Sequence, residues 1–216
     1  MTQVKNILST QTAAVINLGS YEKQRIGHSA CAFKNQALYI IAGATKTMSV
    51  HNCQKSVYCF KLAQKHFVKA PNLNKKRFYH ASCVHSGKIF AFGGWEGVKN
   101  GSINTIERLD VEGNAKAWEL FTFNEVRGVQ HPIVSTLNSS EILILGGIIT
   151  KNLGSAVEPS FDAFVLNEGQ MVVRKVRIDK SEGTSGRAVM IIPGKVIWIR
   201  GANDEVRLYD SNTETV

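Results

Sequence analysis

RFYHASCVHSGKIFAFGGWEG, residues 77–97, is the stretch that decides the fold of this 216-residue chain. Two apolar segments flank the polar turn Ser86-Gly87-Lys88, a pattern that predicts a β-hairpin. The second segment, Ile89-Phe90-Ala91-Phe92, ends on the pair Gly93-Gly94. Glycine permits positive φ angles and close backbone approach, so we expect a crowded turn at this end of the strand.

The same pattern recurs along the chain. Apolar segments end on glycine at four places, namely Gly43-Ala44, Gly93-Gly94, Gly146-Gly147 and Gly201-Ala202. The first glycines of these pairs, at positions 43, 93, 146 and 201, lie 50, 53 and 55 residues apart. A strand-like segment precedes each pair, and one or two more follow it. Repeats of about 50 residues with four strands each predict the blades of a β-propeller, with the glycine-terminated strands near its axis.

The stretch 77–97 and the residues after it resemble a kelch repeat. In that family an Arg and a His precede the first strand, a glycine pair follows the second, and a Trp comes later. The corresponding residues here are Arg77, His80, Gly93-Gly94 and Trp118. Other repeats keep parts of the pattern: Arg25 with His28, Arg127 with His131, and Tyr209 with Asp210. The resemblance implies an all-β, kelch-type β-propeller of about four blades, each with four antiparallel strands, or a part of a larger propeller.

We expect an N-terminal tail over residues 1–11 and the propeller over residues 12–216. The expected blades cover 25–71, 77–124, 127–178 and 187–216, and the last of them stops before a fourth strand. The apolar segment 13–18 is one candidate for that strand, and it would close a four-bladed ring. Alternatively, this segment completes a blade that an adjacent chain begins, or the 216 residues belong to a longer protein.

Composition narrows the classes of partner. The net charge is +9, and Lys and Arg are spread along the chain, so we expect attraction to an acidic protein partner. Nucleic acid is disfavoured, because no helix, zinc finger or RNP-type motif is evident to deliver the charge. No apolar run approaches the ~20 residues of a membrane span. The N-terminus lacks the pattern of a secretory signal, so we expect a cytoplasmic protein.

The cysteines and histidines are interpreted as structural. Cys31, Cys53, Cys59 and Cys83 form no C-x-x-C pair, which argues against a zinc module and a disulfide framework. Cys31 and Cys83 fit small buried residues at equivalent strand positions. Cys53 and Cys59 lie near His51, but no fourth metal ligand is evident, and we predict neither a metal nor a cofactor. The repeated histidines are predicted to be buried and hydrogen-bonded.

The kelch resemblance implies a non-catalytic scaffold for protein–protein interaction, such as a substrate adaptor, a cytoskeletal linker or a subunit of a larger assembly. The sequence contains no BTB-like or F-box-like region. The alternative is a kelch-type enzyme, of the oxidase, epimerase or specifier kind. No G-x-S-x-G, H-E-x-x-H or P-loop occurs, and no His-Tyr constellation surrounds Tyr58 and Cys59, so we predict no catalytic residues.

Partner binding is predicted on the loops of one face. In a blade of antiparallel strands A to D, the B–C loop and the D–A loop leave the sheet on the same side. The cations and aromatic residues on these loops form the predicted partner site, which consists of Lys46, Lys75, Lys76, Arg77, Phe78, Trp95 and Lys99. In the alternative interpretation, the Arg of each repeat is tied into its own blade and the lysines only solvate the rim.

Overall fold

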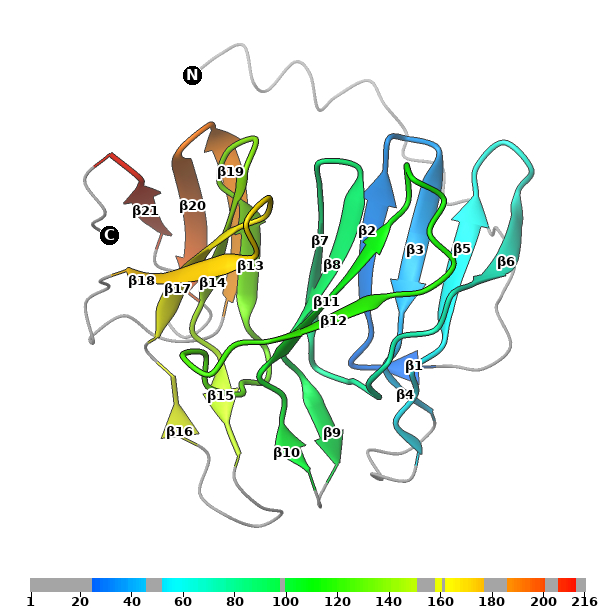
Figure 1. Cartoon of the computed structure of the whole chain (residues 1–216), viewed down its shortest axis with the longest axis horizontal. Coiled ribbons are helices and arrows are strands. Elements are labelled where there is room, and N and C mark those ends of the chain that lie inside the picture. The colour runs from blue at the N-terminus through cyan, green and yellow to red at the C-terminus, as the bar shows by residue number, and fades with distance from the viewer. Residues whose placement is uncertain are drawn as a thin grey trace, which may run out of the picture.

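The computed structural model describes residues 25–45, 52–97, 100–150, 158–160, 162–176, 186–200 and 206–212. These residues contain no α-helix, and their strands form four larger antiparallel sheets and three small two-stranded ones (Figure 1). The protein is therefore all-β, as predicted.

Each larger sheet is one blade, and its strands are numbered outward along the chain. Blade 1 contains β2 (Ser29–Phe33), β3 (Ala37–Ile41), β5 (Val57–Lys61) and β6 (His66–Ala70). Blade 2 contains β7 (Ala81–His85), β8 (Lys88–Phe92), β11 (Thr105–Asp110) and β12 (Glu119–Thr122). Blade 3 contains β13 (Ile133–Thr136), β14 (Glu141–Leu145), β17 (Ala163–Asn167) and β18 (Val172–Val176). Blade 4 contains β19 (Gly186–Ile192), β20 (Lys195–Arg200) and β21 (Val206–Asp210).

The second strand of a blade is apolar at successive positions because its two faces pack against two different neighbours. In β8, Ile89 and Ala91 belong to the core shared with blade 1, whereas Phe90 and Phe92 belong to the core shared with blade 3. The side chains of a strand alternate between its two faces, so one run of apolar residues serves both cores. This arrangement explains the IFAF sequence that precedes the glycine pair.

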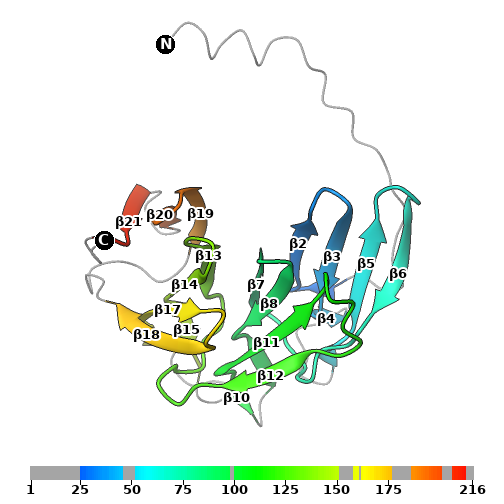
Figure 2. The ribbon, with the colours of Figure 1, turned by 45° about the horizontal axis from the view of Figure 1, so that its top comes forward.

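The blades follow one another in an arc (Figure 2). The first strands, β2, β7, β13 and β19, are in contact in that order and are therefore innermost. The glycine-terminated strands, predicted to lie near the axis, are β3, β8, β14 and β20, which are second from it. Within the described ranges, β19 and β2 make no contact of comparable extent. Residues 13–18 lie outside these ranges, so ring closure by this segment stays a prediction.

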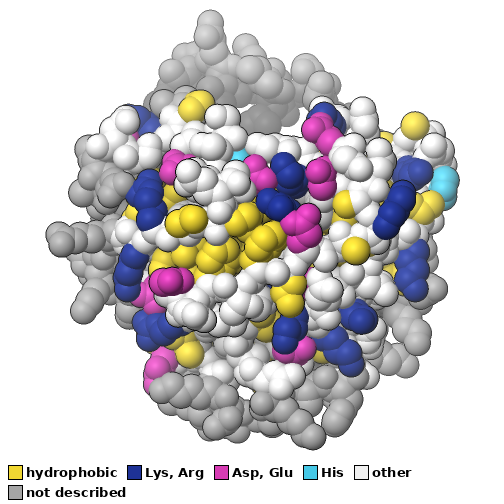
Figure 3. All heavy atoms as spheres, viewed as in Figure 1, with side chains coloured by type: hydrophobic (Ala, Val, Ile, Leu, Met, Phe, Trp, Pro, Cys, Tyr) yellow, Lys and Arg dark blue, Asp and Glu magenta, His cyan; other side chains and the backbone are white. Residues whose placement is uncertain are grey.

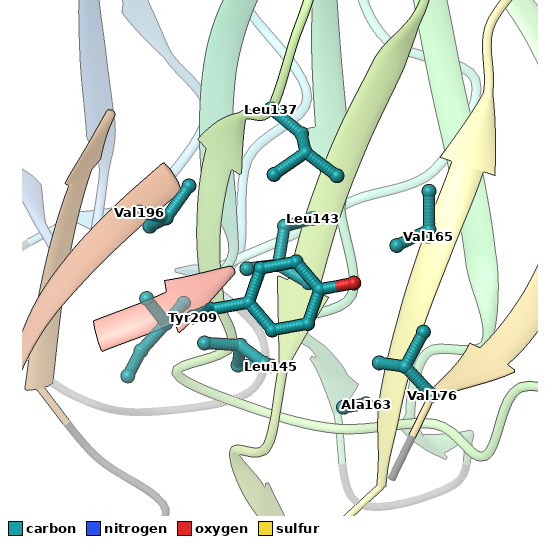
Figure 4. Close-up of a cluster of buried hydrophobic side chains, with 9 residues drawn as sticks. Leu137, Leu143, Leu145, Ala163, Val165, Val176, Val196 and Tyr209 are labelled. Carbon is teal, nitrogen blue, oxygen red and sulfur yellow. The ribbon is translucent and has the colours of Figure 1, made fainter. Parts of the chain in front are cut away.

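The packing of blade 4 against blade 3 shows how neighbouring blades are held together. Tyr209 of β21 is fully buried, and its ring lies among Leu137, Leu143 and Leu145 of blade 3 and Val196 of β20 (Figure 4). Burial of apolar surface of this kind is the main favourable term in folding. Blade 4 is thereby fixed to blade 3 by the same type of core that joins the other blades.

The glycine pair is required where two loops cross the end of the second strand. Gly94 has a φ of 99°, and a Cβ added there would lie 2.9 Å from the carbonyl oxygen of Phe78. Gly43 has a φ of 91° and the same kind of contact, with the carbonyl oxygen of Ile26. Gly43 therefore corresponds to Gly94, so the first repeat uses Ala42-Gly43 rather than the predicted Gly43-Ala44. Ala42 accepts a φ of 50° at the first position of the pair.

Candidate functional site

In blades 1, 2 and 3 the B–C and D–A loops lie on one face and pair with each other. Ile26 pairs with Ala44 between β1 (Arg25–Ile26) and β4 (Ala44–Thr45), and Phe78 pairs with Trp95 at the start of β9 (Trp95–Gly97). In blade 3 the pairing joins Gln130 to Ile148 of β15 (Ile148–Ile149). With β10 (Gly101–Ser102) and β16 (Glu158–Pro159), these short strands extend below the blades in Figure 1. We call this side the loop face.

Glu107 of β11 fixes the D–A loop that enters blade 2. Its buried carboxylate accepts hydrogen bonds from the backbone N–H of Asn74 at 2.5 Å and of Lys75 at 3.1 Å. It also accepts from Asn74 Nδ2 at 3.0 Å and from Arg77 Nε at 2.9 Å. A single carboxylate therefore binds the backbone of Asn74 and Lys75 and the side chain of Arg77, which fixes the loop that carries the lysines.

Arg77 is buried completely, with a relative exposure of 0%. Besides Glu107, its guanidinium donates to the carbonyl oxygens of Gly93 at 2.8 Å and Thr105 at 3.0 Å, and to Thr105 Oγ1 at 2.8 Å. Burial lowers the pKa of Arg77, while the charge of Glu107 acts in the opposite direction. Arg77 is thus tied into its own blade, which was the alternative interpretation of the sequence.

The aromatic residues predicted for the partner site are also buried. Phe78 is 1% exposed and Trp95 is 7% exposed, and their ring centroids lie 5.3 Å apart. With Ala44 and Cys53 they form a small core beneath the loop face. Direct contact of Arg77, Phe78 or Trp95 with a partner does not fit this burial, because their side chains already pack inside. They support the loops from below.

The two predicted lysines within the described ranges lie on the D–A loop before Arg77. Lys75 Nζ is 3.4 Å from Glu96 Oε2, a partly exposed ion pair. Lys76 is exposed and makes no ion pair with a described residue. Lys46 and Lys99 lie outside the described residues. Lys75 and Lys76 are therefore the members of the predicted site that the structure places at the surface.

The three repeat histidines do not share one environment. His80 is buried, its Nε2 lies 2.6 Å from Ser29 Oγ of blade 1, and burial lowers its pKa to about 3. The prediction of a buried, hydrogen-bonded histidine is confirmed for His80, whereas the predicted burial is wrong for His28 and His131, which are exposed; His28 Nδ1 does lie 3.2 Å from the carbonyl oxygen of Arg25. A general base works best with a pKa near the operating pH. The Ser29–His80 pair therefore has the character of a link between blades rather than of a catalytic dyad.

Left-handed backbone conformations mark the loop-face end of the innermost strands. Tyr79 has a φ of 57° and His131 a φ of 52°, and their rings lie 4.2 Å apart. The backbone N–H of Tyr79 donates to Gly27 at 2.7 Å, and that of His131 donates to Tyr79 at 2.7 Å. Non-glycine residues in this region cost of order 1–3 kcal/mol each. These hydrogen bonds join successive blades and hold the strained residues in place.

The cysteines are free thiols. Cys31 and Cys59 both pair with Tyr39 across neighbouring strands, and burial raises the pKa of Cys31 to about 12. Cys53 donates to the carbonyl oxygen of Trp95 at 3.7 Å in the core below the loop face. Among the described residues, no group of three His, Cys, Asp or Glu side chains is arranged to hold a metal ion. His51 lies outside the described residues.

A basic pocket beside the loop face was not predicted. Its volume is about 410 Å³, and its lining includes four cations, namely Arg25, Lys55, Lys69 and Lys76. Its lining contains no Asp or Glu among the residues that the structure describes. Lys69 lies next to Tyr58 across β5 and β6, so strand register brings it to the pocket. The sequence of residues 66–70 predicts a strand, and hence which of its side chains share a face. It does not predict that Lys76 of the D–A loop lines the same pocket.

On the face that Figure 3 shows, positive charge is not gathered in one place. Figure 3 shows Lys and Arg side chains scattered over one side of the molecule, with hydrophobic side chains gathered where blades 2 and 3 lie in Figure 1. The pocket of blade 1, by contrast, brings four cations together.

Comparison with known proteins gives a match to one repeat of the chain. A model of the Kelch motif matches residues 76–119, from the loop before β7 to the first residue of β12. The motif and the arrangement of four-stranded antiparallel sheets define a kelch-repeat β-propeller, a fold associated in general with protein interaction. No curated protein matches the chain. In the part of the chain that the structure describes, no helix is long and apolar enough to cross a membrane.

Proposed function

We propose that the protein is a non-catalytic scaffold, or a subunit of a larger assembly, that binds an acidic protein segment on its loop face. The observation that carries the proposal is the D–A loop before blade 2. Glu107 holds this loop through the backbone of Asn74 and Lys75, and Lys75 and Lys76 project from it to the surface. A preorganised loop loses little conformational entropy when a partner binds.

The charge of the chain supports an acidic partner. The net charge of +9 raises the rate of encounter with a negatively charged surface, and ordered cations on a loop give the encounter a preferred orientation. Lys75 is shared with Glu96, so an incoming carboxylate competes with that ion pair. Lys76 has no such competitor among the described residues.

A charge reversal on this loop tests the proposal. Affinity purification from the native source supplies the partner, and the double variant Lys75→Glu, Lys76→Glu is then titrated with it at low and high salt. We expect binding to weaken by about 1 kcal/mol or more at low salt, and the difference to shrink as salt screens the charges. The matched control is Lys61→Glu, Lys116→Glu, which changes the net charge equally at exposed sites elsewhere. Full affinity of the folded loop variant would place the site on another face.

We also propose a cytoplasmic location, which the four free thiols support because reducing compartments keep cysteines unpaired. Microscopy of the tagged full-length chain tests this, and a signal confined to an oxidising compartment would contradict it.

A further inference from the structure

The basic pocket of blade 1 differs from the corresponding place in blade 2 at one strand position. Arg25 corresponds to Arg77, since it donates to the carbonyl oxygens of Ala42 and Ser56, each at 2.9 Å, and to Ser56 Oγ at 2.6 Å. These contacts repeat those of Arg77 with Gly93 and Thr105. Two residues beyond Thr105 stands Glu107, whereas two residues beyond Ser56 stands Tyr58.

The exchange of Glu for Tyr changes the charge of the site. The Arg25 guanidinium lies over the Tyr58 ring, 4.9 Å from its centroid. The third strand thus supplies a carboxylate in blade 2 and a neutral ring in blade 1. Each arginine is held by its own blade, so the position of the Arg25 side chain is fixed while its charge contributes to the pocket.

Three lysines add to this charge. Lys55, Lys69 and Lys76 are exposed, line the same pocket and make no ion pair with a described residue. Five other lysines have such partners, whereas Lys61, Lys65 and Lys116 have none among the described residues, so the pocket is distinguished by the convergence of its cations. Converging cations repel one another, and an anion bound between them relieves that repulsion.

We propose that this pocket binds a phosphate monoester carried on a serine or threonine of the protein partner, an inference that rests on the proposed function and specifies its ligand. A phosphoserine or phosphothreonine carries about −1.5 to −2 charges at pH 7 and three acceptor oxygens. Lysines bind phosphate as point charges that approach from several directions. Three of the five N–H donors of the Arg25 guanidinium, two on Nη1 and one on Nη2, are used by Ala42 and Ser56, so the lysines supply most of the donors that face the pocket.

The arrangement of the cations fits a protein partner better than a nucleic acid. Nucleic-acid backbones present phosphates in a row and are met by stripes of cations. Here the cations converge on one pocket of about 410 Å³ instead. Ile26, beside Arg25 and 39% exposed, offers an apolar contact to a residue that neighbours the phosphate on a peptide.

Peptide binding to the full-length chain tests the inference. The probes are three fluorescent degenerate peptide libraries that differ only at one fixed position, which is phosphoserine, glutamate or serine. We expect the phosphoserine library to bind at least tenfold more tightly than the other two at low salt. The double variant Lys55→Glu, Lys69→Glu should lose at least tenfold of that affinity, whereas Lys61→Glu, Lys116→Glu should stay within twofold of the unmodified chain. Both variants change the net charge equally, and circular dichroism checks that both are folded.

Three results would overturn the inference. Equal binding of the phosphoserine and glutamate libraries would show that the pocket does not recognise phosphate. Equal losses of affinity in the two double variants would show that binding depends only on net charge. Tighter, pocket-dependent binding of a single-stranded oligonucleotide would assign the pocket to nucleic acid. The proposed function is judged separately, because Lys75 and Lys76 are intact in the pocket variant. If the pocket variant still binds the phosphatase-treated native partner while the Lys75, Lys76 variant does not, that result would support the proposed function and contradict the phosphate inference.

Discussion

Replacing Glu107 by alanine should destabilise the protein far more than an ordinary surface substitution. Glu107 and Arg77 are both 0% exposed, and their ion pair has a 2.9 Å contact. Removing one partner of a buried ion pair leaves the other charge uncompensated, which costs about 3–5 kcal/mol. The donors on Asn74 and Lys75 lie on a partly buried loop and regain water, so they add little to this figure. We therefore expect a loss of about 3–5 kcal/mol in the free energy of unfolding.

Urea unfolding followed by tryptophan fluorescence measures the loss, and thermal unfolding gives a second reading. For a chain of this size each kcal/mol shifts the midpoint by about 2–4 °C, so the expected decrease is roughly 6–20 °C. Glu119→Ala is the matched control, because Glu119 pairs with Arg108 across the same blade at 2.5 Å but is 54% exposed. Exposed pairs of this kind are worth about 0–1 kcal/mol. Equal losses in the two variants would refute the argument that the buried pair organises the loop.

Two further predictions concern the blade junctions. Burial lowers the pKa of His80 to about 3, whereas an unfolded histidine has a pKa of about 6.5. Between these two values the unfolded chain binds the proton and the folded chain does not. The free energy of unfolding should therefore be highest above about pH 6.5 and should fall by about 1.4 kcal/mol per pH unit down to about pH 3. In urea titrations at each pH, His80→Gln should lose this component of the slope and the exposed His66→Gln should keep it; a retained slope in the first variant would contradict the assignment. Gly94→Ala should destabilise by more than 1 kcal/mol, because φ is 99° and the added Cβ would lie 2.9 Å from the Phe78 oxygen, whereas Gly169→Ala meets nothing closer than 3.8 Å. Equal unfolding midpoints for the two alanine variants would show that the crossing of the loops relaxes without strain.

The repeats could be predicted from the sequence, but the side-chain contacts within each blade could not. Hairpins and glycine turns are local features, so residues 77–97 predicted strands and a crowded turn that the structure contains. Ala42 shifted the predicted pair by one residue in the first repeat, because an alanine with a φ of 50° leaves no compositional mark. The burial of Arg77 depends on Glu107, which lies 30 residues further along the chain on β11. That contact follows from blade geometry and not from any pattern near Arg77.

The same limit explains why the pocket was missed. Lys55 precedes β5, Lys69 lies within β6, and Lys76 lies on the loop toward blade 2, so no short window of sequence contains the set. Comparison of repeats after their structural alignment does reveal it. Blades 1 and 2 retain the arginine and its carbonyl acceptors, and they differ in whether the third strand supplies Glu107 or Tyr58.

The equivalent arginines of blades 1 and 2 therefore differ in what their charge does. In blade 2 the arginine and the glutamate neutralise each other and stabilise a loop, and their charges are withdrawn from solvent. In blade 1 the hydrogen bonds to Ala42 and Ser56 hold the arginine in the same way, while Tyr58 leaves the surroundings positive. The scaffold tolerates the exchange because the backbone contacts of the arginine do not depend on the carboxylate. The position of Glu107 in blade 2 and Tyr58 in blade 1 can therefore change between repeats, and with it the charge of the site, while the fold is kept.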